Sequence, residues 1–117
     1  MQCNVGETVM FDRSQLMKGT LEGCILRIIG RETTYGYEIL EKLIQYGFAD
    51  VREGTIYPLL VRLEKKNLIS SEYRTSPLGP SRKYYHLTES GTATVAEFAA
   101  AWTEISHAVD RIFQEEP

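Results

Sequence analysis

The side chains best suited to bind another molecule lie in residues 51–69, which read VREGTIYPLLVRLEKKNLI. If this segment is a helix, its first turn offers Thr55, Tyr57 and free backbone amides near Gly54. Hydroxyls and free amides of this kind hydrogen-bond phosphate oxygens and the edges of bases. Arg62 follows further along, where either a phosphate contact or a solvated charge fits. These residue types indicate nucleic-acid binding, and a plain amphipathic core helix is the alternative that the spacing leaves equally open.

Arg82 and Lys83 form a second candidate binding feature. They follow the segment SPLGPS, whose two prolines and glycine predict a loop rather than a tight two-residue turn. Two adjacent cations at a hairpin tip are ordinarily solvated. In a winged DNA-binding domain, however, the same position lies beside the minor groove or the phosphate backbone. We therefore predict that Arg82 and Lys83 contact DNA.

Positive and negative residues are concentrated in different segments of the chain. The net charge is −3, yet residues 52–87 carry seven Lys or Arg and three Asp or Glu, a net +4. Residues 88–117 carry one and six, a net −5. Attraction to phosphate depends on the local potential as well as on the total charge. The acidic total therefore does not exclude a nucleic-acid partner.

The sequence contains no recognisable catalytic or metal-binding set. It has no glycine-rich phosphate loop, no HExxH motif and no Ser/His/Asp arrangement at a familiar spacing. Its two histidines and the isolated Cys3 and Cys24 do not form a zinc-binding pattern. We therefore expect neither an enzyme nor a bound metal or cofactor.

Length and composition limit the number of domains and the class of protein. A chain of 117 residues suits one domain with at most an accessory helix. With 43% hydrophobic and 25% charged residues, it can bury an ordinary core. The sequence shows neither the roughly 20-residue apolar run of a membrane span nor the start of a signal peptide. These properties predict a cytoplasmic protein with no membrane partner.

Three helices are predicted to position the candidate binding residues. Apolar residues at helical spacing indicate one helix over residues 16–29 and a second from Thr33 or Thr34 to just before Gly47. Either threonine could cap the second helix. The third helix spans about residues 54–66, and Asn67 follows at a position where helices often end in left-handed backbone.

Two strands follow, over residues 68–75 and 82–87, where the hydrophobic period becomes alternating. Three short helices and a two-stranded hairpin are the order of a winged helix-turn-helix, although other small α+β domains also fit the pattern. The predicted fold is α+β, mainly α. It comprises a winged helix-turn-helix over residues 16–88 and a long C-terminal dimerisation helix over residues 89–117. Residues 1–15 are expected to be flexible or to begin the first helix.

The last helix carries an apolar seam. Thr88 and either Glu89 or Ser90 can cap it, and its apolar residues recur at intervals of three and four, as in a coiled coil. Because so small a domain cannot cover such a helix, we predict a homodimer; the alternative is a seam packed entirely on its own domain. The predicted dimer interface consists of Val95, Phe98, Trp102, Ile105, Val109 and Ile112.

Four segments, in this order, resemble the PadR family of transcriptional regulators in its short form with a single C-terminal helix. They are LMKGTLEGCILRII (16–29), TYGYEI (34–39), EGTIYPLLVRLEKKNLI (53–69) and GPSRKYYHLTESG (79–91). The resemblance covers nearly all of residues 16–91. It implies a dimer with a winged helix on each protomer that binds an inverted-repeat operator in double-stranded DNA, usually as a repressor.

The resemblance also implies roles for individual residues. Arg52 stands where many relatives have a small capping residue, so it is either an additional phosphate contact or an imperfect cap. Gly23 and Cys24 replace larger apolar residues, which would loosen the packing there or open a space. Carried over position by position, the family's DNA contacts fall on Tyr35, Thr55, Tyr57, Arg82 and Lys83.

An effector site is a further implication of the resemblance. In the multidrug-sensing branch of the family, a tryptophan of the last helix and its mate across the two-fold axis enclose flat aromatic ligands. Trp102 is similar to that tryptophan in placement, which implies a planar aromatic effector; filling the dimer seam is an equal alternative role. The residues that would line this site are Leu16, Gly23, Phe98, Trp102 and Ser106.

Two further alternatives stay open at this stage. One is a ligand-binding or protein-interaction module of the same fold that does not bind an operator. The other is redox sensing by Cys24, although cysteines on core-facing helices are usually inert packing.

Overall fold

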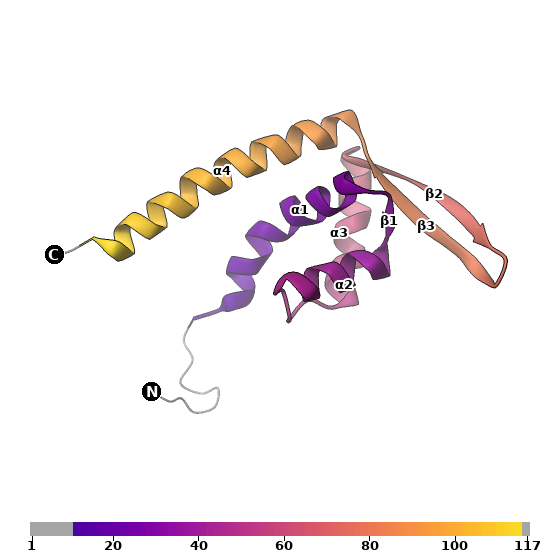
Figure 1. Cartoon of the computed structure of the whole chain (residues 1–117), viewed down its shortest axis with the longest axis horizontal. Coiled ribbons are helices and arrows are strands. Elements are labelled where there is room, and N and C mark those ends of the chain that lie inside the picture. Colours follow the sequence, from indigo (N-terminus) through magenta and orange to yellow (C-terminus); the bar gives the residue numbers. More distant parts are fainter. Residues whose placement is uncertain (1–10, 116–117) are drawn as a thin grey trace, which may run out of the picture.

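A computed structural model gives the fold of residues 11–115 (Figure 1). Four helices and a small antiparallel sheet, whose hairpin projects to one side (Figure 1), make up the fold, which confirms the predicted α+β, mainly helical class. The expectation for residues 1–15 falls largely outside the described residues, although the first helix begins before residue 16. The elements are α1 (Arg13–Arg31), β1 (Thr34–Tyr35), α2 (Gly36–Tyr46), α3 (Glu53–Lys65), β2 (Ile69–Ser76), β3 (Gly79–Leu87) and α4 (Glu89–Gln114).

The core lies where α1, α2 and α3 meet. Their apolar faces are the ones that helical spacing predicts, and Ile25, Ile39 and Ile56 are completely buried there. Tyr85 of β3 closes the core from the sheet side. Burying each large apolar side chain is worth about 1.5–3 kcal/mol, so this cluster supplies the main free energy that holds the three helices together.

The start of α2 differs from the prediction. Thr34 is not a helix cap but part of β1, and Tyr35 is the N-cap residue, with no side-chain bond to the helix. The reason is that β1 pairs with β3, which keeps the backbone of Thr34 extended. The buried Thr34 hydroxyl instead donates a hydrogen bond to Oε1 of Glu38, 2.5 Å away.

The sheet order is β1-β3-β2, with all neighbours antiparallel. The two-residue strand β1 is too short for an alternating pattern to reveal it. The predicted loop in SPLGPS is wrong, because Ser76 pairs with Gly79 and leaves Pro77 and Leu78 as a two-residue turn. Proline at the second and glycine at the fourth position suit such a turn. A register shift between Arg74 and Ser76 accommodates it.

A joint of hydrogen bonds connects the end of α3 to the start of α4. Asn67 adopts the predicted left-handed backbone, with φ of 65°. The amide of Thr88 donates to the carbonyl of Leu68 (3.1 Å), and its hydroxyl donates to the carbonyl of Asn67 (2.8 Å). The same hydroxyl accepts from the amide of Gly91 (2.9 Å), which makes Thr88 the cap of α4 as predicted.

The helix α4 leaves the rest of the fold after its first half (Figure 1). Val95 and Phe98 are half-buried against their own chain, so the first part of the predicted seam has an intramolecular contact. The second part is open, with exposed fractions of 48% for Trp102, 59% for Ile105 and 71% for Ile112. Among residues 11–115, no helix is both long and apolar enough to cross a membrane.

Candidate nucleic-acid interface

The first turn of α3 is open to an incoming ligand. Arg52 occupies the N-cap position without a side-chain cap bond, as expected because a guanidinium accepts no hydrogen bonds. The amides of the first turn are therefore left without a capping side chain. A Cβ atom at Gly54 would meet nothing within 4 Å. Thr55 is half-buried, and Tyr57 is 42% exposed. A phosphate or base edge can approach this turn closely.

Tyr57 also connects α3 to α2. Its ring and hydroxyl lie against Gly36, the first residue of α2, so closely that a Cβ atom at Gly36 would overlap the ring. A side chain at this position would push the Tyr57 ring away, so this close contact depends on the glycine. The contact brings the exposed edge of Tyr57 beside Tyr35 and Tyr37, at the start of α2.

Arg82 and Lys83 lie within β3 and not at the hairpin tip, since the turn is at Pro77 and Leu78. Adjacent residues of a strand point to opposite faces of the sheet, and the two cations accordingly have different partners. The guanidinium carbon of Arg82 lies 4.5 Å from the ring centroid of Tyr35. Arg82 remains exposed, so its guanidinium is positioned by the tyrosine without being buried.

Lys83 faces the α3 side of the hairpin. Its Nζ lies 3.2 Å from Oε1 of Glu64 on α3, and 5.7 Å from the ring centroid of Tyr85. The other carboxylate oxygen of Glu64 accepts a hydrogen bond from the hydroxyl of Ser71 on β2 (2.6 Å). This hydrogen bond, together with Lys83, lowers the pKa of Glu64, although partial burial acts in the opposite direction. Glu64 is therefore ionised at neutral pH and able to pair with Lys83.

The structure gathers most of the predicted contacts around one surface hollow of about 480 Å³. Arg52 and Thr55 lie at the start of α3 and do not line this hollow. Residues that spacing did not single out also line it, including Tyr37 and Val61, which are about half exposed. The lining consists of Tyr35, Gly36, Tyr37, Tyr57, Val61, Arg82, Lys83 and Tyr85.

Arg62 is a predicted contact that also lies outside the hollow and has a partner on α1. Its guanidinium forms an ion pair with Glu22 of α1, with 2.7 Å between Nη2 and Oε2. The structure thus gives Arg62 an ion-pair partner on α1, at the protein surface.

Arg74 is a further cation that the sequence did not single out. It lies directly opposite Arg82 in the β2–β3 pairing, and its guanidinium carbon is 4.6 Å from the ring centroid of Tyr84. Tyr84 in turn packs edge-on against Tyr35, with 5.4 Å between ring centroids. Arg74 could be recognised from its cross-strand pairing with Arg82. That pairing can be predicted only when the turn between the two strands is placed correctly.

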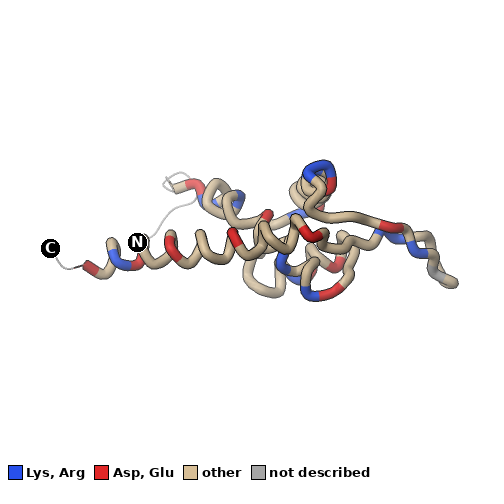
Figure 2. The backbone as a smooth tube through the Cα atoms, turned by 90° about the horizontal axis from the view of Figure 1, so that it is seen from above, with Lys and Arg blue, Asp and Glu red and all other residues tan. Residues whose placement is uncertain are grey.

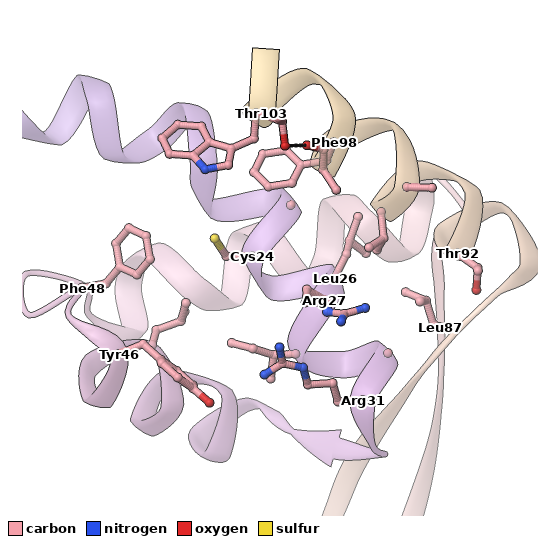
Figure 3. A pocket seen from close by; sticks show the side chains of 18 residues that line it. Cys24, Leu26, Arg27, Arg31, Tyr46, Phe48, Leu87, Thr92, Phe98 and Thr103 are labelled. Atoms are coloured by element: carbon pink, nitrogen blue, oxygen red, sulfur yellow. Dashed lines mark hydrogen bonds between the residues drawn. The ribbon is translucent and has the colours of Figure 1, made fainter. Parts of the chain in front are cut away.

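Two grooves flank the contact between α1 and α4. The larger, of about 750 Å³, has Cys24, Arg27, Arg31, Tyr46 and Phe48 in its wall, as the close view in Figure 3 shows. The smaller, of about 560 Å³, has Leu16, Cys24, Phe48, Phe98 and Trp102 among its lining residues.

Phe98 divides these two grooves. The space expected at Gly23 is filled, because the Phe98 ring lies directly on this glycine and leaves no room for a Cβ atom. Of the five candidate effector residues, the structure brings together Leu16, Phe98 and Trp102 in the smaller groove and Gly23, Phe98 and Trp102 in the larger. Ser106 lines neither groove; its hydroxyl donates to the carbonyl of Thr103 (3.3 Å).

The charges are distributed as the sequence indicates. Acidic residues are spaced along α4, whereas the hairpin and the end of α3 carry most of the Lys and Arg of residues 52–87 (Figure 2). No cluster of three or more potential metal ligands occurs within residues 11–115. The candidate site is therefore an arrangement of hydroxyls, free amides and cations, which suits binding of a polyanion.

The helix order, the three-stranded sheet and the open turn of α3 define a winged helix-turn-helix domain with a long additional C-terminal helix. Residues 25–97, more than half of the chain, match the transcriptional regulator PadR-like family, to which this chain belongs.

Solved structures and a curated relative agree with this assignment. A PadR-like transcriptional regulator from Bacillus cereus is 49% identical, with a TM-score of 0.81 over 87% of this chain and 99% of the other. A Streptococcus transcriptional regulator is 45% identical, with a TM-score of 0.78 over 86% and 98%. A transcriptional regulator from Mycobacterium tuberculosis is 33% identical over 85 residues, which are 73% of this chain and 78% of the relative.

Proposed function

We propose that this regulator is a dimeric repressor that binds an inverted-repeat operator through α3 and the β2–β3 hairpin, called the wing below. Two observations carry the proposal: the first turn of α3 is open at Gly54, and Tyr57 of the same helix shares one hollow with Arg82 and the tyrosines at the start of α2. A helix that presents its first turn in this way can enter the major groove, where it reads base edges.

The contacts divide into two kinds in this proposal. Thr55 and the exposed edge of Tyr57 face the bases, because they lie in the first turns of α3. Arg52 and Arg82 bind phosphates on either side of the groove, since both are exposed and neither has an ion-pair partner among the described residues. Phosphate contacts position the protein and base contacts supply specificity.

A second copy of the chain is proposed to cover the far half of α4. Trp102, Ile105, Val109 and Ile112 are 45–71% exposed and lie on one stripe of the helix. Exposed apolar patches of this kind mark interaction sites, and the spacing of three and four residues suits a coiled-coil partner. Dimerisation would place two α3 helices about 34 Å apart, in successive major grooves.

The α1–α4 grooves are the proposed effector site. Leu16, Phe98 and Trp102 line the smaller groove, and the indole and phenyl rings there suit stacking against a planar compound. Both grooves lie between α1 and the helix that would join the two copies, so a ligand there can change how the two α3 helices are spaced. Such a ligand releases DNA only if it binds more tightly to the dimer whose α3 helices are not spaced for the operator than to the DNA-binding form.

The proposal is tested by titrating the protein with duplex DNA from its own upstream region and with a scrambled duplex, at two salt concentrations. We expect tight binding of the upstream duplex and weak, strongly salt-dependent binding of the scrambled one. Equal binding of both duplexes, together with quenching of Trp102 fluorescence by planar aromatic compounds, would favour a ligand-binding module of the same fold instead.

A further inference from the structure

We propose that Glu64 is a positioning residue that fixes the wing against α3, and that Lys83, which it holds, does not contact DNA. This inference rests on the proposed DNA-binding function. It changes the role of Lys83 from a phosphate contact to part of a brace, and it assigns a role to Glu64 that residue type and spacing did not indicate.

One carboxylate connects three elements. Glu64 lies near the end of α3, and its two oxygens reach different strands: Oε1 is 3.2 Å from Nζ of Lys83 on β3, and Oε2 accepts a 2.6 Å hydrogen bond from Ser71 on β2. Ser71 lies directly opposite Tyr85, two residues beyond Lys83, so both contacts come from the same face of the wing. The brace therefore restrains both strands of the wing relative to one helix.

The angle between α3 and the wing decides which DNA contacts form together. The first turn of α3 carries Thr55 and Tyr57, and the wing carries Arg82 on its other face. Both sets must meet the same duplex if the protein is to bind in one register. The side chains of Glu64 and Lys83 are only about one-third exposed, which leaves Lys83 little freedom to exchange its carboxylate for a phosphate.

Removal of Glu64 should change DNA affinity in opposite directions, depending on whether Lys83 contacts a phosphate or is part of the brace. A carboxylate beside a polyanion ordinarily weakens binding, so its removal would strengthen binding if Lys83 were a phosphate contact that it partly neutralises. If Glu64 is a brace, its removal loosens the wing and weakens operator binding. Replacement by Gln separates these accounts further, because Gln keeps an acceptor oxygen at the same length while losing the charge.

The experiment compares Glu64→Ala, Glu64→Gln and Lys83→Met with the unmodified full chain, by anisotropy titration of the operator duplex over a range of salt concentrations. We expect Glu64→Ala to weaken operator binding by roughly tenfold or more, the effect of losing one charge-assisted hydrogen bond. Glu64→Gln should lie between Ala and the unmodified chain. Lys83→Met should weaken binding without changing the slope of log Kd against log salt.

Glu72→Gln is the matched control. Glu72 is also a carboxylate of the wing, but its partners, Arg74 (2.9 Å) and His86 (3.5 Å), both belong to the wing itself. Its removal takes away the same charge without touching α3, and binding should not weaken. Tighter binding for both Glu64 variants by equal factors, or a slope that falls by about one for Lys83→Met, would overturn the inference.

A second readout does not require DNA. Backbone amide hydrogen exchange of residues 69–87 should be at least several-fold faster in Glu64→Ala and Lys83→Met than in the unmodified chain, and unchanged in Glu72→Gln. Unchanged exchange in all variants would overturn the brace. Failure of the unmodified chain to prefer any operator would instead contradict the proposed function, and the exchange rates would still decide whether Glu64 fixes the wing.

Discussion

The surface formed by α3 and the wing differs from the far half of α4 in how its side chains are partnered. On α3 and the wing, Arg82 lies on Tyr35, Tyr57 lies on Gly36, and Glu64 holds Lys83. On the far half of α4, Ile112 and Phe113 are 71% and 85% exposed. The first surface is ordered by contacts within one chain, and the second carries apolar side chains that a single chain does not cover.

This difference suits a dimer in which one chain orders the groups for DNA and two chains set their spacing. In the proposed dimer, each protomer alone would present an ordered set of groups for DNA, because Tyr35 positions Arg82 before any ligand arrives. Correct spacing of two such sets depends on α4, which is fixed to its own domain at Thr88 and Gly91 and by Phe98 on Gly23. Operator recognition in this account needs both, and each can be disturbed separately.

The largest effect should follow from breaking the proposed dimer. Ile105→Glu with Val109→Glu places two charges in the exposed seam of α4, where a partner would have to desolvate them. We expect a monomer by sedimentation velocity, and operator affinity reduced by at least about 100-fold because two linked half-site contacts become independent.

The matched control for this pair is Ala100→Glu with His107→Glu. Both positions are exposed and lie on the opposite side of α4, so the same charge is added away from the seam. The control should remain a dimer. A dimer in the seam variant as well would show that the two copies meet through another surface, or that the far half of α4 serves another purpose.

The next effect concerns the joint between α3 and α4. In Gly91→Ala, the new Cβ atom would overlap the backbone carbonyl of Leu68, which cannot move aside as a side chain could. We expect a loss of about 2–3 kcal/mol in the free energy of unfolding by urea. Gly19→Ala on α1 is the control, since nothing lies within 4 Å of its Cβ position. It should be neutral or stabilising by about 0.5–1 kcal/mol. Equal effects at both glycines would contradict the tight joint.

A smaller pair of effects distinguishes positioning from reading on the DNA surface. Arg82→Ala should weaken binding to operator and scrambled duplex alike, and lower the salt slope by about one. Thr55→Val should instead reduce the preference for operator over scrambled duplex by about tenfold. Arg27→Ala removes an equal charge from α1, away from this surface, and should leave the preference unchanged. If only Arg82→Ala lowered the preference for operator, Arg82 would be the residue that reads bases and Thr55 would not.

The features of the fold that could be predicted from the sequence are those set by residues close together in the chain. The core face of α3, the cap at Thr88 and the left-handed Asn67 follow from local spacing and residue type, and the structure confirms them. Strand β1 and the turn at Pro77 and Leu78 do not, because their geometry is set by pairing with β3. An extended backbone at Thr34 is a tertiary property that no local cap signal contains.

The candidate site shows the same limit. Residue types identified Tyr57 and Arg82, and the family resemblance added Tyr35; the structure places all three around one hollow. Spacing could not show that Arg62 pairs with Glu22, 40 positions earlier, or that Lys83 pairs with Glu64. Both pairings join different elements, so they become visible only once the helices and strands are placed in space.

The smallest effect concerns Cys24, which lines both grooves. Burial raises the pKa of its thiol, so the thiolate fraction at neutral pH lies below that of an ordinary cysteine. In a Cys3→Ser background, alkylation should be slow at pH 7 and accelerate about tenfold per pH unit. Cys24→Ala should change operator affinity less than about twofold. A reaction rate that is already constant near pH 7 would instead indicate a reactive, redox-capable thiol.

The mass of the protein–DNA complex tests the central claim most directly. Native mass spectrometry of the full chain with a duplex that carries its inverted-repeat operator should show two chains per duplex, even when protein is limiting. A duplex with a single half-site should bind far more weakly. Complexes with one chain per duplex, of equal stability on both duplexes, would contradict a dimer that reads two half-sites.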